Sequence, residues 1–148
     1  MRNGWILCLE NNDMSKRINY NIKRIKGHAD ERGYFLEILR ISDSGFPIKQ
    51  VSIASIKPGE IRGNHYHNKR QEWFLMIGGE AELYIANPFS REKKKIGISE
   101  EKPVLINIMP YTAHAFKNIS KKIIYIIEID DTEYIRRNPD IVSFIVCK

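Results

Sequence analysis

Short stretches rich in branched and aromatic residues recur along this chain, and turn residues separate them at regular intervals. No window of normal helix length keeps an apolar period of 3.6 residues together with helix caps. We therefore expect strands in the segments 34–39, 51–56, 73–77, 80–86, 94–99, 103–108, 114–119 and 122–129. Regular short strands of this kind are typical of a β-barrel or a jelly roll. The sequence thus predicts an all-β fold.

The length of 148 residues predicts a single domain. Residues 1–20 are polar and weakly patterned, so we expect an N-terminal arm there and the folded domain in 21–148. No apolar run approaches the roughly 20 residues that span a bilayer, and no membrane partner is expected. Cys8 and Cys147 lie at opposite ends of the chain and form neither a metal motif nor a disulfide framework, which indicates a cytoplasmic protein.

The formal charge of +6 raises the question of nucleic acid. The basic residues are scattered, however, and acidic residues lie among them, so we expect a solvated surface and no polynucleotide groove. The same charge balance suits a small anionic ligand such as a diphosphate.

One stretch combines metal-binding side chains with a predicted strand. His65 and His67 point to the same face of a strand, roughly 7 Å apart at the backbone. Glu72 begins the next strand after a short turn, and we expect a hairpin that brings its carboxylate beside the two imidazoles. His114 is the best candidate for a third nitrogen donor. Three imidazoles and a carboxylate form a typical site for a divalent metal.

These residues resemble the cupin motifs. The first motif matches at Gly59, His65, His67, Glu72 and Gly79, and the second matches at His114 and Asn118. Met109 and Tyr111 stand where the second motif usually has Pro and Gly. The resemblance implies a cupin jelly-roll β-barrel, also called a double-stranded β-helix. It also implies a divalent metal, with zinc the first choice and manganese, iron or nickel as alternatives, whose ligands are His65, His67, Glu72 and His114.

A second resemblance narrows the family. "ADERGYFLEILR" and "IRGNHYH" resemble segments of dTDP-4-dehydrorhamnose 3,5-epimerases, and the similarity is closest to the cupin domain of capsular-polysaccharide nucleotide-sugar epimerases. Sugar 3,4-ketoisomerases share the Arg-Gly-x-His-x-His pattern of the second segment. This resemblance implies that Arg32, Glu37 and Arg62 contact a nucleotide diphosphate and that His65 is the general base. It further implies a homodimer in which Arg32 and Glu37 act across the subunit interface.

The resulting hypothesis is an epimerase or isomerase acting on a nucleoside-diphosphate 4-keto-6-deoxy sugar in surface polysaccharide biosynthesis. The reaction removes a proton next to the keto group. If a metal is bound, His65 serves as one of its ligands; if the site holds no metal, His65 is the free base that takes the proton. Tyr125 is a candidate proton donor. The alternatives are another metal-dependent cupin enzyme, such as a dioxygenase or a sugar-phosphate isomerase, and a non-catalytic sugar-binding cupin.

Overall fold

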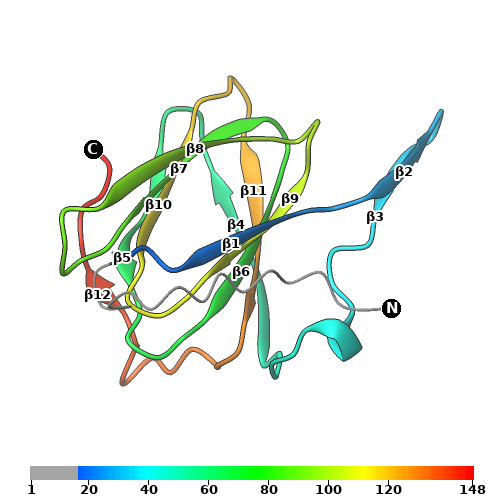
Figure 1. The fold of residues 1–148 in the computed structure, drawn as a ribbon. Coiled ribbons are helices and arrows are strands. Elements are labelled where there is room, and N and C mark those ends of the chain that lie inside the picture. The colour runs from blue at the N-terminus through cyan, green and yellow to red at the C-terminus, as the bar shows by residue number, and fades with distance from the viewer. Residues whose placement is uncertain (1–16) are drawn as a thin grey trace.

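The computed structural model describes residues 17–148 and confirms the all-β fold (Figure 1). Two five-stranded antiparallel sheets form a barrel, one with the strand order β1-β9-β6-β11-β4 and the other with β12-β5-β10-β7-β8. Strands β2 and β3 form a separate hairpin. The strands are β1 Tyr20–Arg24, β2 Gly27–Asp30, β3 Gly33–Leu36, β4 Gln50–Ile56, β5 Ile61–Tyr66, β6 Glu72–Ile77, β7 Glu80–Ala86, β8 Lys93–Ser99, β9 Val104–Ile108, β10 Ala113–Asn118, β11 Ile124–Asp130 and β12 Val142–Ser143.

The barrel interior is filled by alternate residues of the facing strands, because successive side chains of a strand point to opposite faces. The expected inward side of β7, with Ala81, Leu83 and Ile85, is buried in this core. The other large members of the core are Ile56, Phe74, Met76, Ile98, Ile106, Ile108, Phe116, Ile124 and Ile126.

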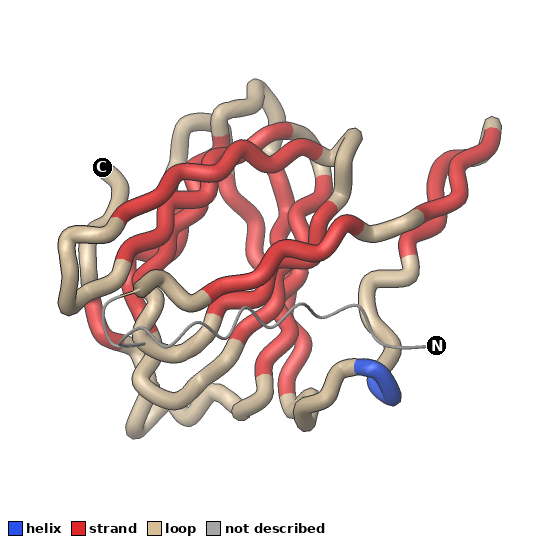
Figure 2. Tube along the Cα trace, viewed as in Figure 1, coloured by secondary structure: helices blue, strands red, loops and turns tan. Residues whose placement is uncertain are grey.

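A second apolar cluster lies on the outer face of the first sheet. Trp73, Leu75, Leu105 and Ile129 point away from the barrel interior and pack with Ile25 and with the connection that follows β3. This connection includes a 3-10 helix, Ile41–Asp43, seen in blue in Figure 2. Strands β6, β9 and β11 are therefore apolar on both faces.

The N-terminal region is only partly described. Residues 1–16 of the predicted arm, with Cys8, lie outside the described residues. Ile18 and Tyr20 pack against the barrel core, and β1 pairs with β9. The β2–β3 hairpin extends away from the barrel (Figure 1). Among the described residues, no helix is long and apolar enough to cross a membrane.

Close pairing of β5 with β10 depends on a glycine. Gly63 has a φ of 109°, in a region that favours glycine, and it pairs with Ala115 next to a register shift. A Cβ atom added to Gly63 would lie 2.6 Å from the carbonyl oxygen of His114. The absence of a side chain therefore lets the two histidine-bearing strands approach each other.

Replacing this glycine should destabilise the barrel. We expect Gly63→Ala to lower the free energy of unfolding by about 2 kcal/mol or more, since it combines backbone strain with a clash. Gly97→Ala is the matched control, because a Cβ atom at that strand position meets nothing within 4 Å. Urea denaturation measures both, and equal stability of the two variants would contradict the assignment.

Candidate functional site

The polar residues of the barrel interior gather at one end of the sheets, where they line a cavity of about 250 Å³. The inward positions of β11 illustrate the change along one strand. Ile124 and Ile126 belong to the apolar core, whereas Glu128 and Asp130 line the cavity. The core thus closes one end of the barrel interior and leaves a polar cavity at the other.

The four predicted metal ligands lie together in this cavity. His65, His67, Glu72 and His114 each offer one donor atom, and these atoms all lie within 4.8 Å of one another. His65 and His114 come from the paired strands β5 and β10, and His67 directly follows β5. Three of the four are fully buried, whereas His65 is partly exposed. The expectation that His65 and His67 share a face is confirmed, with ring centroids 4.9 Å apart.

The route that brings Glu72 to the imidazoles differs from the prediction. Strands β5 and β6 belong to opposite sheets, so the expected hairpin between them is wrong. The segment 67–71 crosses from one sheet to the other, and Glu72 meets the histidines across the barrel interior. A strand pattern read along the chain does not reveal this crossover.

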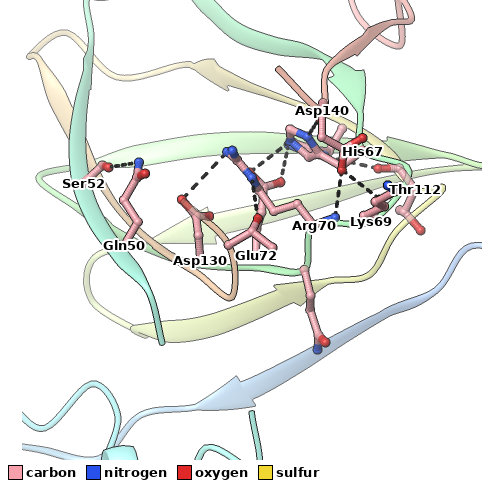
Figure 3. Close-up of polar contacts among 12 residues, drawn as sticks. Gln50, Ser52, His67, Lys69, Arg70, Glu72, Thr112, Asp130 and Asp140 are labelled. Carbon is pink, nitrogen blue, oxygen red and sulfur yellow. Dashed lines mark hydrogen bonds and ion pairs between the residues drawn. The ribbon is translucent and has the colours of Figure 1, made fainter. Parts of the chain in front are cut away.

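The orientation of two rings determines which nitrogen faces Glu72. Nδ1 of His67 donates to the carbonyl oxygen of Asp140 (Figure 3), and Nδ1 of His114 lies 3.2 Å from the carbonyl oxygen of Thr112. A carbonyl oxygen only accepts, so in the neutral rings Nδ1 carries the proton and Nε2 carries a lone pair. The two Nε2 atoms lie 3.1 and 3.3 Å from the carboxylate oxygens of Glu72.

In this arrangement the lone pairs on Nε2 of His67 and His114 face the lone pairs on the carboxylate oxygens of Glu72, which is unfavourable. Among the described residues, Nε2 of His67 and Oε2 of Glu72 are buried without a hydrogen-bond partner. A buried polar atom left in this state is costly. A cation between the imidazoles and the carboxylate removes the conflict, so the donor set fits a divalent metal.

The electrostatics of the cluster favour neutral imidazoles at two positions. Burial, together with the neighbouring His114 and His67, lowers the pKa of His65 to about 4. Burial likewise lowers the pKa of His114. Burial opposes a rise in the pKa of His67, but the Glu72 carboxylate raises it overall. At neutral pH, His65 and His114 therefore present lone pairs that a metal or a proton can take.

Asp140 holds the crossing segment, although the sequence analysis did not identify it. Its carboxylate accepts hydrogen bonds from the backbone N–H groups of Asn68, Lys69 and Arg70 at 2.9, 2.8 and 2.9 Å (Figure 3). Its carbonyl oxygen accepts a hydrogen bond from Nδ1 of His67. One residue of the C-terminal tail thus orients both the segment and a ring of the cluster, and no local pattern links residues so distant in sequence.

Arg70 and Asp130 place buried charges on the cavity wall, and both were missed. Arg70 donates from Nε to Thr132 at 3.3 Å, and its Nη1 lies 3.9 Å from Asp130. Burial and the nearby Glu72 raise the pKa of Asp130 to about 7, although Arg70 opposes the rise. In the sequence Arg70 sits in a charged turn and Asp130 at a strand end, where both resemble ordinary surface residues.

Arg62 lies at the cavity, as predicted. Its Nε donates to the carbonyl oxygen of Ser55 at 2.9 Å, which anchors the guanidinium on the wall. Within residues 17–148 no other hydrogen bond engages this side chain, so the planar fork of donors remains available for an anionic ligand.

The structure does not bring Arg32 and Glu37 to the cavity of their own chain. Arg32 lies on the projecting hairpin and pairs with Asp30. Glu37 follows the hairpin and pairs with Arg40 at 2.7 Å. Their predicted contact with a nucleotide therefore depends on a second subunit.

Tyr125 lies outside the site. It is 43% exposed on β11, where the inward positions are Ile124, Ile126, Glu128 and Asp130. Alternation places its side chain on the opposite face of the strand. This placement contradicts the role of Tyr125 as a proton donor in the cavity of its own chain.

The second motif keeps its geometry despite its unusual residues. Tyr111, at the usual glycine position, has a φ of 61°, in the left-handed region that glycine occupies easily. Its backbone N–H donates to the carbonyl oxygen of His67 at 2.7 Å. Asn118 is fully buried and donates to the carbonyl oxygens of Ile56 and Lys122 at 2.8 Å each. Its role is therefore to hold neighbouring loops.

Two facing antiparallel sheets with a His-His-Glu-His cluster at one end define a cupin-type β-barrel. The model of the polysaccharide biosynthesis C-terminal domain family matches residues 28–142. The chain belongs to this family.

Two named proteins are similar in sequence to this chain. The UDP-2-acetamido-2,6-beta-L-arabino-hexul-4-ose reductase of Pseudomonas aeruginosa is 32% identical over 113 residues, which cover 76% of this chain. The chain spans only 29% of the length of that reductase. The spore coat polysaccharide biosynthesis protein SpsL of Bacillus subtilis is 29% identical over 125 residues, which cover 80% of this chain and 81% of SpsL.

A solved structure shows the same fold. QdtA, a sugar 3,4-ketoisomerase from Thermoanaerobacterium thermosaccharolyticum crystallised with TDP, superimposes with a TM-score of 0.69 at 21% identity. The match covers 84% of this chain and 87% of QdtA.

Proposed function

We propose that the chain acts as an epimerase or keto-isomerase on a nucleoside-diphosphate 4-keto-6-deoxy sugar in surface polysaccharide biosynthesis. The observation that carries this proposal is a single cavity that joins the buried His-His-Glu-His cluster to Arg62. The names of the relatives support it, since one is a reductase of a UDP-linked hexul-4-ose and another a spore coat polysaccharide protein. QdtA, which shares the fold, is named as a ketoisomerase and was crystallised with a nucleotide. The proposed setting is the cytoplasm.

The proposed cofactor is a divalent metal, zinc first, held by His65, His67, Glu72 and His114. The fit rests on the lone pairs that these side chains turn toward one another. Such an ion supplies Lewis-acid stabilisation of negative charge on a keto oxygen, an effect of several kcal/mol.

The chain's own side chains supply binding and proton transfer in this proposal. Arg62 binds the diphosphate at the cavity and places the sugar against the cluster. Only a carbon next to the keto group yields a carbanion stabilised as an enolate, so that carbon must face His65. His65 is the least buried member of the cluster and is neutral at pH 7, since its pKa lies near 4. It therefore serves as a ligand or accepts the proton.

We further propose a homodimer built on two exposed apolar surfaces. Tyr34 and Phe35 on the β2–β3 hairpin are 60% and 70% exposed. Val51 and Ile53 on β4, an edge strand, are 65% and 68% exposed. An isolated two-stranded hairpin is marginally stable, and an open edge strand invites pairing. A partner barrel that covers residues 28–40 would bury the exposed hairpin surface and pair with the open edge of β4. It would also bring Arg32 and Glu37 near the partner's cavity.

Proton exchange tests the proposed reaction. In deuterated water, the protein should introduce deuterium at the carbon next to the keto group of a dTDP- or UDP-linked 4-keto-6-deoxy sugar, as measured by proton NMR. We expect His65→Ala to slow this exchange by about 10²-fold or more. Arg62→Ala should mainly raise KM, because it removes a binding contact. Exchange no faster than in buffer alone would exclude the epimerase and favour another metal-dependent cupin reaction.

The assembly is tested by light scattering. At micromolar concentration the protein should have twice the mass of one chain, and Phe35→Asp should shift it toward the monomer. Ile145→Asp is the control, since Ile145 is also exposed, at 60%, but lies near the C-terminus and away from both surfaces. A monomeric wild-type protein would contradict the proposed dimer.

A further inference from the structure

The wall of the cavity that carries Glu128 and Asp130 has no assigned role in the proposed reaction. Both residues are on β11, and strand alternation directs them inward because Ile124 and Ile126 lie in the core while Ile127 and Ile129 contact the outer cluster. Gln50 faces this wall from β4, where it is paired in register with Asp130 (Figure 3). The wall therefore presents two carboxylates to whatever enters the cavity.

Asp130 has a carboxylate oxygen, Oδ1, without a hydrogen-bond partner among residues 17–148. The residue is only 1% exposed, and among the described residues no group donates to its Oδ1. Arg70 lies 3.9 Å from the other oxygen, which is too far for a hydrogen bond. Gln50 does not donate to this oxygen either, because its amide nitrogen donates to Ser52 and its amide oxygen accepts from Tyr134. A buried acceptor of this kind requires a donor from a ligand or from water.

Charge limits which ligand group can lie against this wall. Burial raises the pKa of both acids, that of Asp130 to about 7, so the negative charge on this wall is complete only above neutral pH. In that range the two carboxylates repel a phosphate, so a diphosphate must lie toward Arg62 instead. A metal ion is also disfavoured beside Asp130, since the Arg70 guanidinium already occupies that side. A neutral group with O–H donors meets neither repulsion and matches the acceptors.

We propose that Glu128 and Asp130 form a hydroxyl-binding subsite for the sugar ring, which selects neutral sugars over sugars that carry a carboxylate. This inference rests on the proposed function and names the part of the substrate that the β11 wall recognises. Discrimination follows from the same carboxylates, since they accept hydrogen bonds from hydroxyls and repel a second anion at close range.

Two stable ligands that differ at one carbon test the subsite. UDP-glucose and UDP-glucuronate share the nucleotide and the ring, and glucuronate replaces the neutral hydroxymethyl group with a carboxylate. By isothermal titration calorimetry at about pH 8, where Asp130 is mostly ionised, we expect the wild-type protein to bind UDP-glucose at least about tenfold more tightly than UDP-glucuronate. If the protein binds dTDP and not UDP, the corresponding dTDP-linked pair is used.

The ratio of the two affinities is the readout in the variants, because an effect on the nucleotide that both ligands share cancels in it. Glu128→Gln and Asp130→Asn should each reduce the ratio at least about threefold. Glu101→Gln, an exposed carboxylate outside the cavity, should leave it unchanged. Thermal unfolding checks each variant, and Glu128→Gln alone decides if Asp130→Asn fails to fold.

The two possible failures are distinguishable. Binding of UDP or dTDP without preference between the two sugars, or a ratio that both variants leave unchanged, would overturn the subsite and keep the proposed function. Failure of the wild-type protein to bind either nucleoside diphosphate would overturn both.

Discussion

The placement of two imidazoles against one buried carboxylate is the constraint on which the rest of the site depends. Backbone carbonyls hold Nδ1 of His67 and of His114, and so direct both Nε2 lone pairs toward Glu72. In the absence of a cation, a proton relieves this conflict at one ring only, since the pKa of His67 is raised whereas that of His114 is lowered. The barrel stabilises an arrangement that is unfavourable until a positive charge is present, which is typical of a binding site.

The barrel supports this arrangement from three sides. The apolar core holds the strands that carry the histidines and Glu72. Gly63 lets β5 approach β10 closely, and Asp140 fixes the segment that joins His67 to Glu72. The ligand set is thus organised by contacts from distant parts of the chain. The same organisation leaves Arg62 and the two carboxylates of β11 on the walls of the cavity, where they would contact the proposed substrate.

Sequence patterns predicted most strands and the cluster, because His-x-His on a strand and the alternation of β7 are local signals. Tyr125 was misplaced for a physical reason: β11 is apolar on both faces, so alternation does not distinguish its inner side from its outer side. The expected hairpin at Glu72 failed because the consecutive strands β5 and β6 lie in opposite sheets of the barrel. Arg70, Asp130 and Asp140 acquire their roles only through contacts across the fold, which no local pattern encodes.

Metal content tests the central claim most directly. Protein expressed with ample metal and analysed by elemental mass spectrometry should carry close to one equivalent of a divalent metal, zinc first. His67→Ala should lose most of it, whereas His28→Ala, which alters an exposed histidine on the hairpin, should keep it. Retention by His65→Ala would assign His65 as the base, and loss would assign it as a ligand. Wild-type protein without bound metal, or His67→Ala with full metal, would contradict the account.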